Sequence, residues 1–200
     1  MLGSMNPLVL RVRNGRWWTT TSAYILSSVV GGACIGWLLG AIGAVLHEAS
    51  VAPSWRIAAA LLGACGLAGG LLDSGVFGIR LPTVRRQVDE QWRYRYRNWI
   101  YAIGYGFQLG LGFTTIVTTA TVYATFVAMI LVASQPIGLA LGAWFGLTRS
   151  VSVLAVAGVR NFGQFESIEM ALARYYAPSR IATIAMEAFI GCALVALVTL

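Results

Sequence analysis

The sequence has no lysine, a single histidine and few charged side chains of either sign. All 14 basic residues are arginines, and charged residues make up only 10% of the 200 residues. Soluble globular domains carry about 25% charged residues, and His47 alone offers little for acid–base catalysis. The sequence also contains no phosphate-binding glycine loop and no serine-nucleophile motif. We therefore expect neither ordinary soluble-type catalysis nor a bound cofactor or metal.

Hydrophobic residues take the place of the missing charge. They account for 58% of the chain, and the mean hydropathy is +0.74. A water-soluble fold could not cover so much apolar surface, and a disordered chain would be far more polar. The arginines behind the net charge of +7 lie between apolar runs instead of on one basic face, so no nucleic-acid partner is expected. The sequence predicts an integral protein of the cell inner membrane, with the lipid bilayer as its partner.

Five apolar runs predict an all-α polytopic protein with about five transmembrane helices. Roughly 20 residues are needed to cross a bilayer. The expected spans are residues 20–46, 57–78, 108–133, 137–159 and 181–200, within a single transmembrane domain over residues 1–200. The third apolar run already begins at Trp99 and is too long for one plain helix. We expect that run to be entered through an interfacial or broken segment over residues 99–107.

The arginines predict how the chain is oriented. Cytoplasmic loops of membrane proteins carry an excess of basic residues. Five crossings with a cytoplasmic N-terminus place both polar loops, residues 80–98 and 160–180, on the cytoplasmic side. Six crossings would move Arg160, Arg174 and Arg180 outside, so five agrees better with the charge distribution.

Residues 80–98 alternate arginine with aromatic side chains. This pattern is typical of an amphipathic segment lying on anionic lipid headgroups, and docking of a cytoplasmic protein is the alternative. The arginines expected at the lipid surface are Arg85, Arg86, Arg93, Arg95 and Arg97.

Glycines recur every four residues in two of the expected spans. Membrane helices associate through small residues that let their backbones approach closely. We expect these glycine ridges to pack the helices of one bundle, with self-association of two copies as the alternative. The ridges consist of Gly32, Gly36 and Gly40 in the first span and Gly138, Gly142 and Gly146 in the fourth.

Three ionisable residues fall inside expected spans. A charged side chain in the hydrocarbon layer costs at least ~2.5–3.5 kcal/mol on insertion scales, so such residues face the bundle interior and are functional by default. We predict that Arg149 and Glu187 form a buried pair that binds or gates a solute, and a purely structural pair is the alternative. Asp73 either joins this path or snorkels to the interface.

Hydroxyl side chains share one face of the third span. Such groups can bond back to carbonyls of their own helix, or they can line a path and replace the hydration water of a solute. We favour the path. Its expected lining is Thr114, Thr118, Thr121 and Thr125, with Gln108 at the mouth.

Cys34, Cys65 and Cys192 lie in three different apolar runs and follow no disulfide or zinc spacing. We expect each to be a small buried hydrophobic residue. Redox use of these thiols is the alternative.

One segment resembles a known family. The run from Gly106, GFQLGLGFTTIVTT, is similar to the broken helix of the CcdA/DsbD-type cytochrome c biogenesis and thiol-reductant carriers, a group related to the LysE-like exporters. Cys34 stands where the matching helix of the other half-repeat has its cysteine. The resemblance implies a helical membrane fold that passes reducing equivalents between two facing cysteines. Thr114 and Thr115 replace the family's Pro-Cys, which counts against a dithiol relay.

The leading hypothesis is a transporter or exporter that moves a small solute or ion along the threonine-lined path. Two alternatives stay open. One is a CcdA-like redox protein that uses Cys34, and the other is a non-catalytic membrane subunit or anchor that docks a protein partner through residues 80–98. The oligomeric state and the substrate are left open by all three.

Overall fold

The computed structural model describes residues 16–51, 53–75, 97–112, 119–159 and 161–199, and every regular element within these ranges is helical. The prediction of a helical fold is confirmed for this part of the chain. In chain order the elements are α2 (Trp17–Glu48), α3 (Trp55–Ser74), α5 (Asn98–Leu111), α6 (Thr121–Leu131), α7 (Gln135–Val151), the 3-10 helix η1 (Ser152–Val156) and α8 (Phe162–Thr199).

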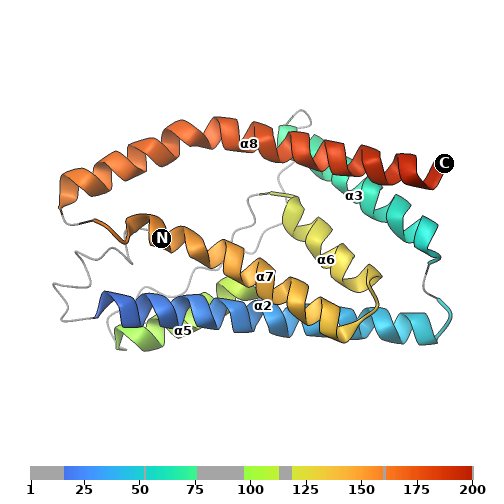
Figure 1. Ribbon diagram of the computed structural model, residues 1–200, viewed down its shortest axis with the longest axis horizontal. Helices are drawn as coiled ribbons and strands as arrows, with labels where there is room; N and C mark the ends of the chain where they lie inside the picture. The colour runs from blue at the N-terminus through green and yellow to red at the C-terminus, as the bar shows by residue number, and fades with distance from the viewer. Residues whose placement is uncertain (1–15, 52, 76–96, 113–118, 160, 200) are drawn as a thin grey trace.

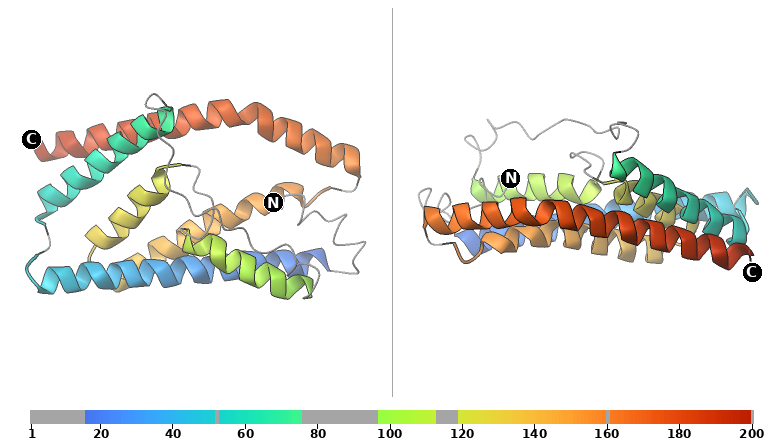
Figure 2. Two further views of the ribbon diagram at one scale, coloured as in Figure 1. Left: turned by 180° about the vertical axis from the view of Figure 1, so that it is seen from behind. Right: turned by 90° about the horizontal axis from the view of Figure 1, so that it is seen from above.

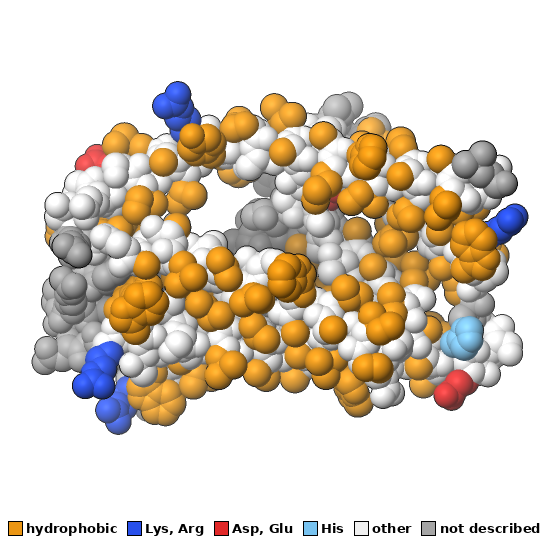
Figure 3. Space-filling model, in the orientation of Figure 1, with side chains coloured by type: hydrophobic (Ala, Val, Ile, Leu, Met, Phe, Trp, Pro, Cys, Tyr) orange, Lys and Arg blue, Asp and Glu red, His pale blue; other side chains and the backbone are white. Residues whose placement is uncertain are grey.

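Four stretches of helix are long and apolar enough to cross a membrane. They are Trp17–Glu48, Trp55–Ser74, Gln135–Val156 and Phe162–Thr199. Hydrophobic side chains are spread over most of the face shown in Figure 3. Because soluble proteins rarely expose so continuous an apolar surface, these helices support membrane association. The described part of the chain therefore offers four such helices, where the sequence predicted five spans.

The helices form a flat, elongated bundle. In Figure 1, α2 and α8 form the two long edges, and the view from above in Figure 2 shows how thin the bundle is. Helices α5 and α7 pack on α2, α3 packs on the C-terminal half of α8, and α6 lies between the two groups. The molecule thus consists of two helix groups that meet at α6.

Glycines form the contact between α2 and the antiparallel α7. A Cβ built on Gly36 would fall on the carbonyl oxygen of Gly138, and one on Gly32 would fall on that of Gly142. The hydroxyl of Ser28 donates to the carbonyl oxygen of Gly146 across the same contact, at 2.9 Å. The backbones approach so closely that no side chain fits between them, as expected from the glycine ridges.

A second glycine surface joins α3 to α8. A Cβ on Gly63 would lie 3.0 Å from the carbonyl oxygen of Gly191, and one on Gly66 would lie 3.2 Å from that of Glu187. Close approach of these antiparallel helices brings polar groups at the end of α3 against the middle of α8. This contact positions the candidate site described below.

The third apolar run is broken, but not where the sequence predicted. Residues 99–107 are regular helix within α5, which ends at Leu111 and is followed by Gly112 at φ +80°. A second helix, α6, begins at Thr121. Both helices point in the same direction as α2, one after the other (Figure 1). The expected single span over 108–133 is therefore two short helices in series.

The last helix begins much earlier than the predicted span over 181–200. Helix α8 starts at Phe162 and continues through Pro178, so the expected polar loop over 160–180 is helical from Phe162 onward. Its 38 residues extend about 57 Å at 1.5 Å per residue, beyond the ~30 Å hydrocarbon layer. Most side chains of its N-terminal half are exposed, and an open space separates that half from α7 in Figure 3.

Two other helices end earlier than predicted. The second span, expected to reach residue 78, ends as helix at Ser74, where Gly75 adopts φ +75° and donates to the carbonyl oxygen of Leu72. The fourth span, expected to reach residue 159, leaves α-helical geometry after Val151 and continues as η1.

Candidate functional site

The start of α6 is bonded to a carboxylate from another helix. Asp73, near the C-terminal end of α3, accepts the backbone N–H of Ala120 with both carboxylate oxygens, at 3.0 and 2.9 Å. Ala120 directly precedes α6, where backbone N–H groups lack partners within the helix and the helix dipole favours negative charge. Asp73 is only 8% exposed, so this is a buried carboxyl group at a helix N-terminus.

A second carboxylate reaches the same helix end from α8. The hydroxyl of Thr121 donates to Oε1 of Glu187, and the Glu187 side chain is 6% exposed. Its other oxygen, Oε2, is buried and accepts no hydrogen bond from the described residues. Three helices therefore bring two acidic side chains to the first turn of α6.

Arg180 fixes the position of α3 against α8. It donates Nε and Nη2 to the main-chain carbonyl oxygen of Asp73, at 3.0 and 2.6 Å. The last carbonyls of a helix have no partners within the helix, and a cation at that end also complements the helix dipole. Arg180 thus holds the residue whose side chain bonds to the start of α6.

A basic side chain lies at the end of α5, whereas acidic side chains lie at the start of α6. Nη1 of Arg149, on α7, donates to the carbonyl oxygen of Gly112 across a long contact of 3.4 Å. The same guanidinium lies 5.3 Å from the centre of the Phe145 ring, within the range of a cation–π contact. The break in the third run therefore has a cation at the carbonyl end of α5 and anions at the amide end of α6, the arrangement that helix dipoles favour.

The predicted path residues do not all come together. Asp73, Thr121 and Glu187 meet at α6, and Asp73 is buried instead of lying at the interface. The structure gives Arg149 and Glu187 different partners, Gly112 and Thr121.

The remaining path residues have other surroundings. Thr125 donates to the carbonyl oxygen of Thr121 at 2.8 Å, so its hydroxyl bonds back to its own helix. Gln108 is half-buried on α5. Thr114 and Thr118 lie outside the described residues. Of the two stripe threonines that the structure describes, Thr121 contacts the charged cluster and Thr125 bonds to its own helix.

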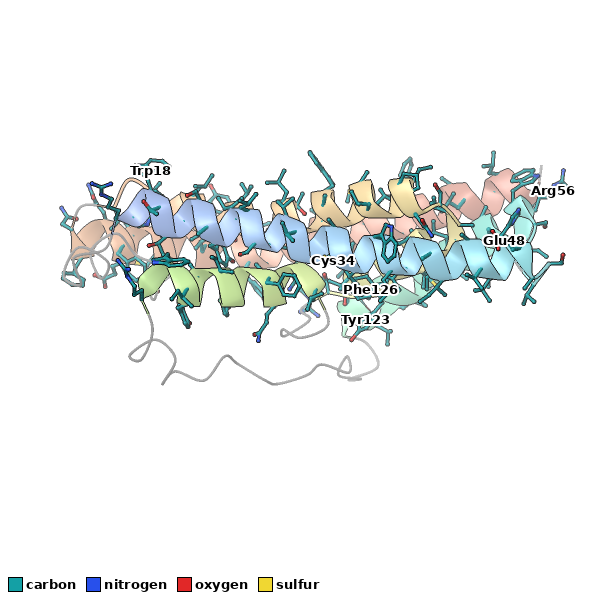
Figure 4. All side chains as sticks on the ribbon, turned by 90° about the horizontal axis from the view of Figure 1, so that it is seen from below. Trp18, Cys34, Glu48, Arg56, Tyr123 and Phe126 are labelled. Carbon is teal, nitrogen blue, oxygen red and sulfur yellow. The ribbon has the colours of Figure 1, made fainter. Side chains whose placement is uncertain are left out.

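The three cysteines are free thiols on three different helices. Cys34 on α2 and Cys192 on α8 are exposed, and Cys65 on α3 is half-buried. Figure 4 places Cys34 about midway between Trp18 at one end of the bundle and Glu48 at the other. Within the described ranges, no three His, Cys, Asp or Glu side chains gather as metal ligands.

Of the arginines predicted at the lipid surface, Arg97 is exposed and directly precedes α5. The others, Arg85, Arg86, Arg93 and Arg95, lie outside the described residues.

Two contributors to the interior were missed from the sequence. From the sequence, Arg180 was considered only for the side of the membrane on which its loop lies. Its bond to a main-chain oxygen of α3 leaves no pattern in the sequence. Tyr24 is fully buried in α2 and stacks on Tyr105 of α5 at 6.0 Å. Tyr105 in turn stacks on Tyr101 at 6.0 Å. The four-residue spacing of the two α5 tyrosines is the signal that could have indicated a shared helix face.

Comparison with known proteins finds three relatives, which carry the same protein name. The chain is similar to the methylamine utilization protein MauF. It is 32% identical over 137 residues to MauF of Paracoccus versutus, which covers 68% of this chain and 49% of the relative. MauF of Paracoccus denitrificans is 29% identical, over 68% of this chain and 48% of the relative. MauF of Methylophilus methylotrophus is 28% identical, over 69% of this chain and 47% of the relative. The chain spans about half the length of the curated relatives it matches.

No family model matches the chain, and no solved structure matches it.

These relatives correct the functional hypotheses drawn from the sequence. The resemblance to CcdA/DsbD-type carriers and LysE-like exporters is wrong, because the relatives found are MauF proteins. The glycine- and threonine-rich run over residues 106–119 is too common a composition for membrane helices to identify that family. The transporter hypothesis and the thiol-redox alternative are contradicted by the same finding, and the anchor alternative gains no support from it.

Proposed function

We propose that this chain acts in methylamine utilization as an integral membrane protein. The observation that supports the proposal is its similarity to MauF over about two thirds of its length, at 28–32% identity to three relatives. The four long apolar helices support a place in the membrane. Because the chain spans only about half of those relatives, its part in the process is proposed for this segment alone.

We further propose that the chain acts through the charged break between α5 and α6. Ionisable groups within a membrane are costly to hold, and they mark functional sites by default. Asp73 and Glu187 are both more than nine-tenths buried at one helix end, and Arg149 bonds to the carbonyl of Gly112, which follows the other helix. A helix interrupted at mid-depth leaves backbone groups that only buried partners can satisfy.

Growth of the source organism tests the proposed function. Deletion of the coding sequence is expected to abolish growth with methylamine as the sole nitrogen source while growth on ammonium stays normal. The wild-type chain restores growth, and Glu187→Leu at equal membrane abundance does not. Glu48→Gln, an exposed position at the far end of α2 (Figure 4), is the matched control and restores growth. A deletion strain that grows normally on methylamine contradicts the proposal.

The topology we propose has five crossings and a cytoplasmic N-terminus, with α5 and α6 together forming one broken crossing. Arg16 precedes α2 and Arg97 precedes α5, which runs parallel to it, so both arginines lie at the same end of the bundle. A basic end on the cytoplasmic side agrees with the positive-inside rule. Arg56 lies at the opposite end (Figure 4).

Cysteine labelling distinguishes this topology from one with four crossings. In a chain whose native cysteines are replaced by alanine, Val51→Cys and Ser167→Cys each introduce one thiol at an exposed position. Three crossings separate the two positions if α5 and α6 span the membrane together, and two separate them otherwise. We expect a membrane-impermeant maleimide to label position 51 in intact spheroplasts and position 167 only after permeabilisation. Labelling of both from the same side contradicts five crossings.

A further inference from the structure

Glu187 has one bonded and one unbonded carboxyl oxygen in the bundle interior. Oε1 accepts the hydroxyl of Thr121, while Oε2 is buried and has no hydrogen-bond partner among the described residues. An ionised carboxylate offers about four acceptor positions and no donor. A buried anion with one satisfied oxygen leaves most of that capacity unused, so its charge needs another source of compensation.

No cation among the described side chains supplies that compensation. Arg180, the arginine nearest along α8, directs Nε and Nη2 to the carbonyl oxygen of Asp73. On the α3 side, Oε2 faces backbone at Gly69 and Gly70, where an added Cβ would lie 3.7 and 3.8 Å away. From α6, the group bonded to Glu187 is the hydroxyl of Thr121. The only ionisable side chain facing Glu187 from another described helix is Asp73, which is also acidic.

The two carboxyl groups are not equivalent. Both oxygens of Asp73 accept the N–H of Ala120, so its negative charge lies directly at the positive end of the α6 dipole. Glu187 receives a single hydroxyl bond. Two carboxyl groups that share one site do not both ionise readily, and the one with fewer donors keeps its proton.

We propose that Glu187 is a proton-binding site that holds its proton on Oε2. A proton on Oε2 requires no space beyond that of the covered oxygen atom. An unsatisfied neutral hydroxyl costs far less than an unpaired ion in a low-dielectric interior. The proposal is independent of the role in methylamine utilization, because a chain without that role could hold the same proton.

Infrared spectroscopy of the purified full chain in lipid nanodiscs tests this proposal. We expect wild-type protein at neutral pH to show the carbonyl stretch of a protonated carboxylic acid. Glu187→Gln should remove that band, and its amide has nearly the shape of the neutral acid, so the fold is retained. Asp73→Asn tests whether the band comes from Asp73 instead. Absence of the band from the wild type overturns the proposal, as does a band that persists in Glu187→Gln or disappears only in Asp73→Asn.

The pH dependence of stability gives a second readout. A folded chain that holds a proton which the unfolded chain releases loses stability as pH rises. Ordinary carboxyl groups remain ionised from about pH 6 to about pH 9, so a slope in that range is not due to them. We expect the thermal midpoint of the wild type to fall over this range and that of Glu187→Gln to fall less. Equal slopes for the two proteins contradict proton binding at Glu187.

Discussion

The carboxylate of Asp73 on α3 accepts the backbone N–H of Ala120, 47 residues further along the chain, immediately before α6 begins. This bond joins a helix of one group to the helix that lies between the two groups. Ala120 directly precedes the first residue of α6, where backbone N–H groups lack partners within the helix. The side chain of Asp73 therefore helps to define where α6 starts.

Asp73→Leu is expected to destabilise the fold more than Asp73→Asn. Leucine leaves the N–H of Ala120 without its acceptor, at a cost of about 1–3 kcal/mol. Asparagine keeps an acceptor oxygen and loses only the interaction of the charge with the helix dipole, which is worth up to about 2 kcal/mol in buried geometries. Thermal unfolding of both variants in nanodiscs measures the difference. Equal midpoints for the wild type and both variants would show that the bond contributes nothing.

Arg149→Met is expected to destabilise the end of α5. Methionine keeps much of the side-chain bulk but removes the cation at the carbonyl of Gly112 and the contact with the Phe145 ring. Each of these contributions is worth about 0.5–1 kcal/mol at partly exposed positions. A midpoint for Arg149→Met equal to that of the wild type would contradict these contributions.

Gly112→Ala is expected to be poorly tolerated. The residue has φ +80°, and an added Cβ would lie 2.7 Å from Cζ of Phe126 and 2.9 Å from Cε1 of Phe145. The left-handed backbone alone costs about 1–2 kcal/mol for an L-residue, and the aromatic rings would also have to move. Expression level and thermal midpoint in membranes report the loss. A variant as stable as the wild type would mean that the chain does not break at this residue.

Gly36→Ala and Gly104→Ala form a matched pair in two helices. The added methyl at Gly36 would meet the carbonyl oxygen of Gly138, whereas nothing lies within 4 Å of the one at Gly104. We expect overpacking at Gly36 to cost about 1–3 kcal/mol or more, and Gly104→Ala to be neutral or stabilising by up to about 1 kcal/mol. If both variants unfold at the wild-type temperature, α2 and α7 do not pack through this ridge.

The sequence was most informative about features with a local cause. Hydropathy predicted the helices, and the four-residue repeat of Gly32, Gly36 and Gly40 predicted a closely packed face, because both depend on neighbouring residues. The helical nature of residues 162–180 was missed because their polar side chains resemble a loop. Polar side chains do not by themselves end a helix, and Pro178 is accommodated within α8.

The contacts of the candidate site depend on distant parts of the chain. Burial in a membrane span singled out Asp73, Arg149 and Glu187 as residues that need partners. It could not identify those partners, because two of them are backbone groups, the N–H of Ala120 and the carbonyl of Gly112. Any residue type supplies such groups, so no pattern in the sequence marks them.

Hydrogen exchange at the amide of Ala120 tests the central claim most directly. If α6 starts within the bundle and is bonded there by Asp73, this amide exchanges slowly in the wild-type protein in nanodiscs. Its exchange should accelerate at least tenfold in Asp73→Leu, as expected from a loss of about 1.4 kcal/mol or more in local stability. Rapid exchange in the wild type, or the same slow rate in both proteins, would contradict the account.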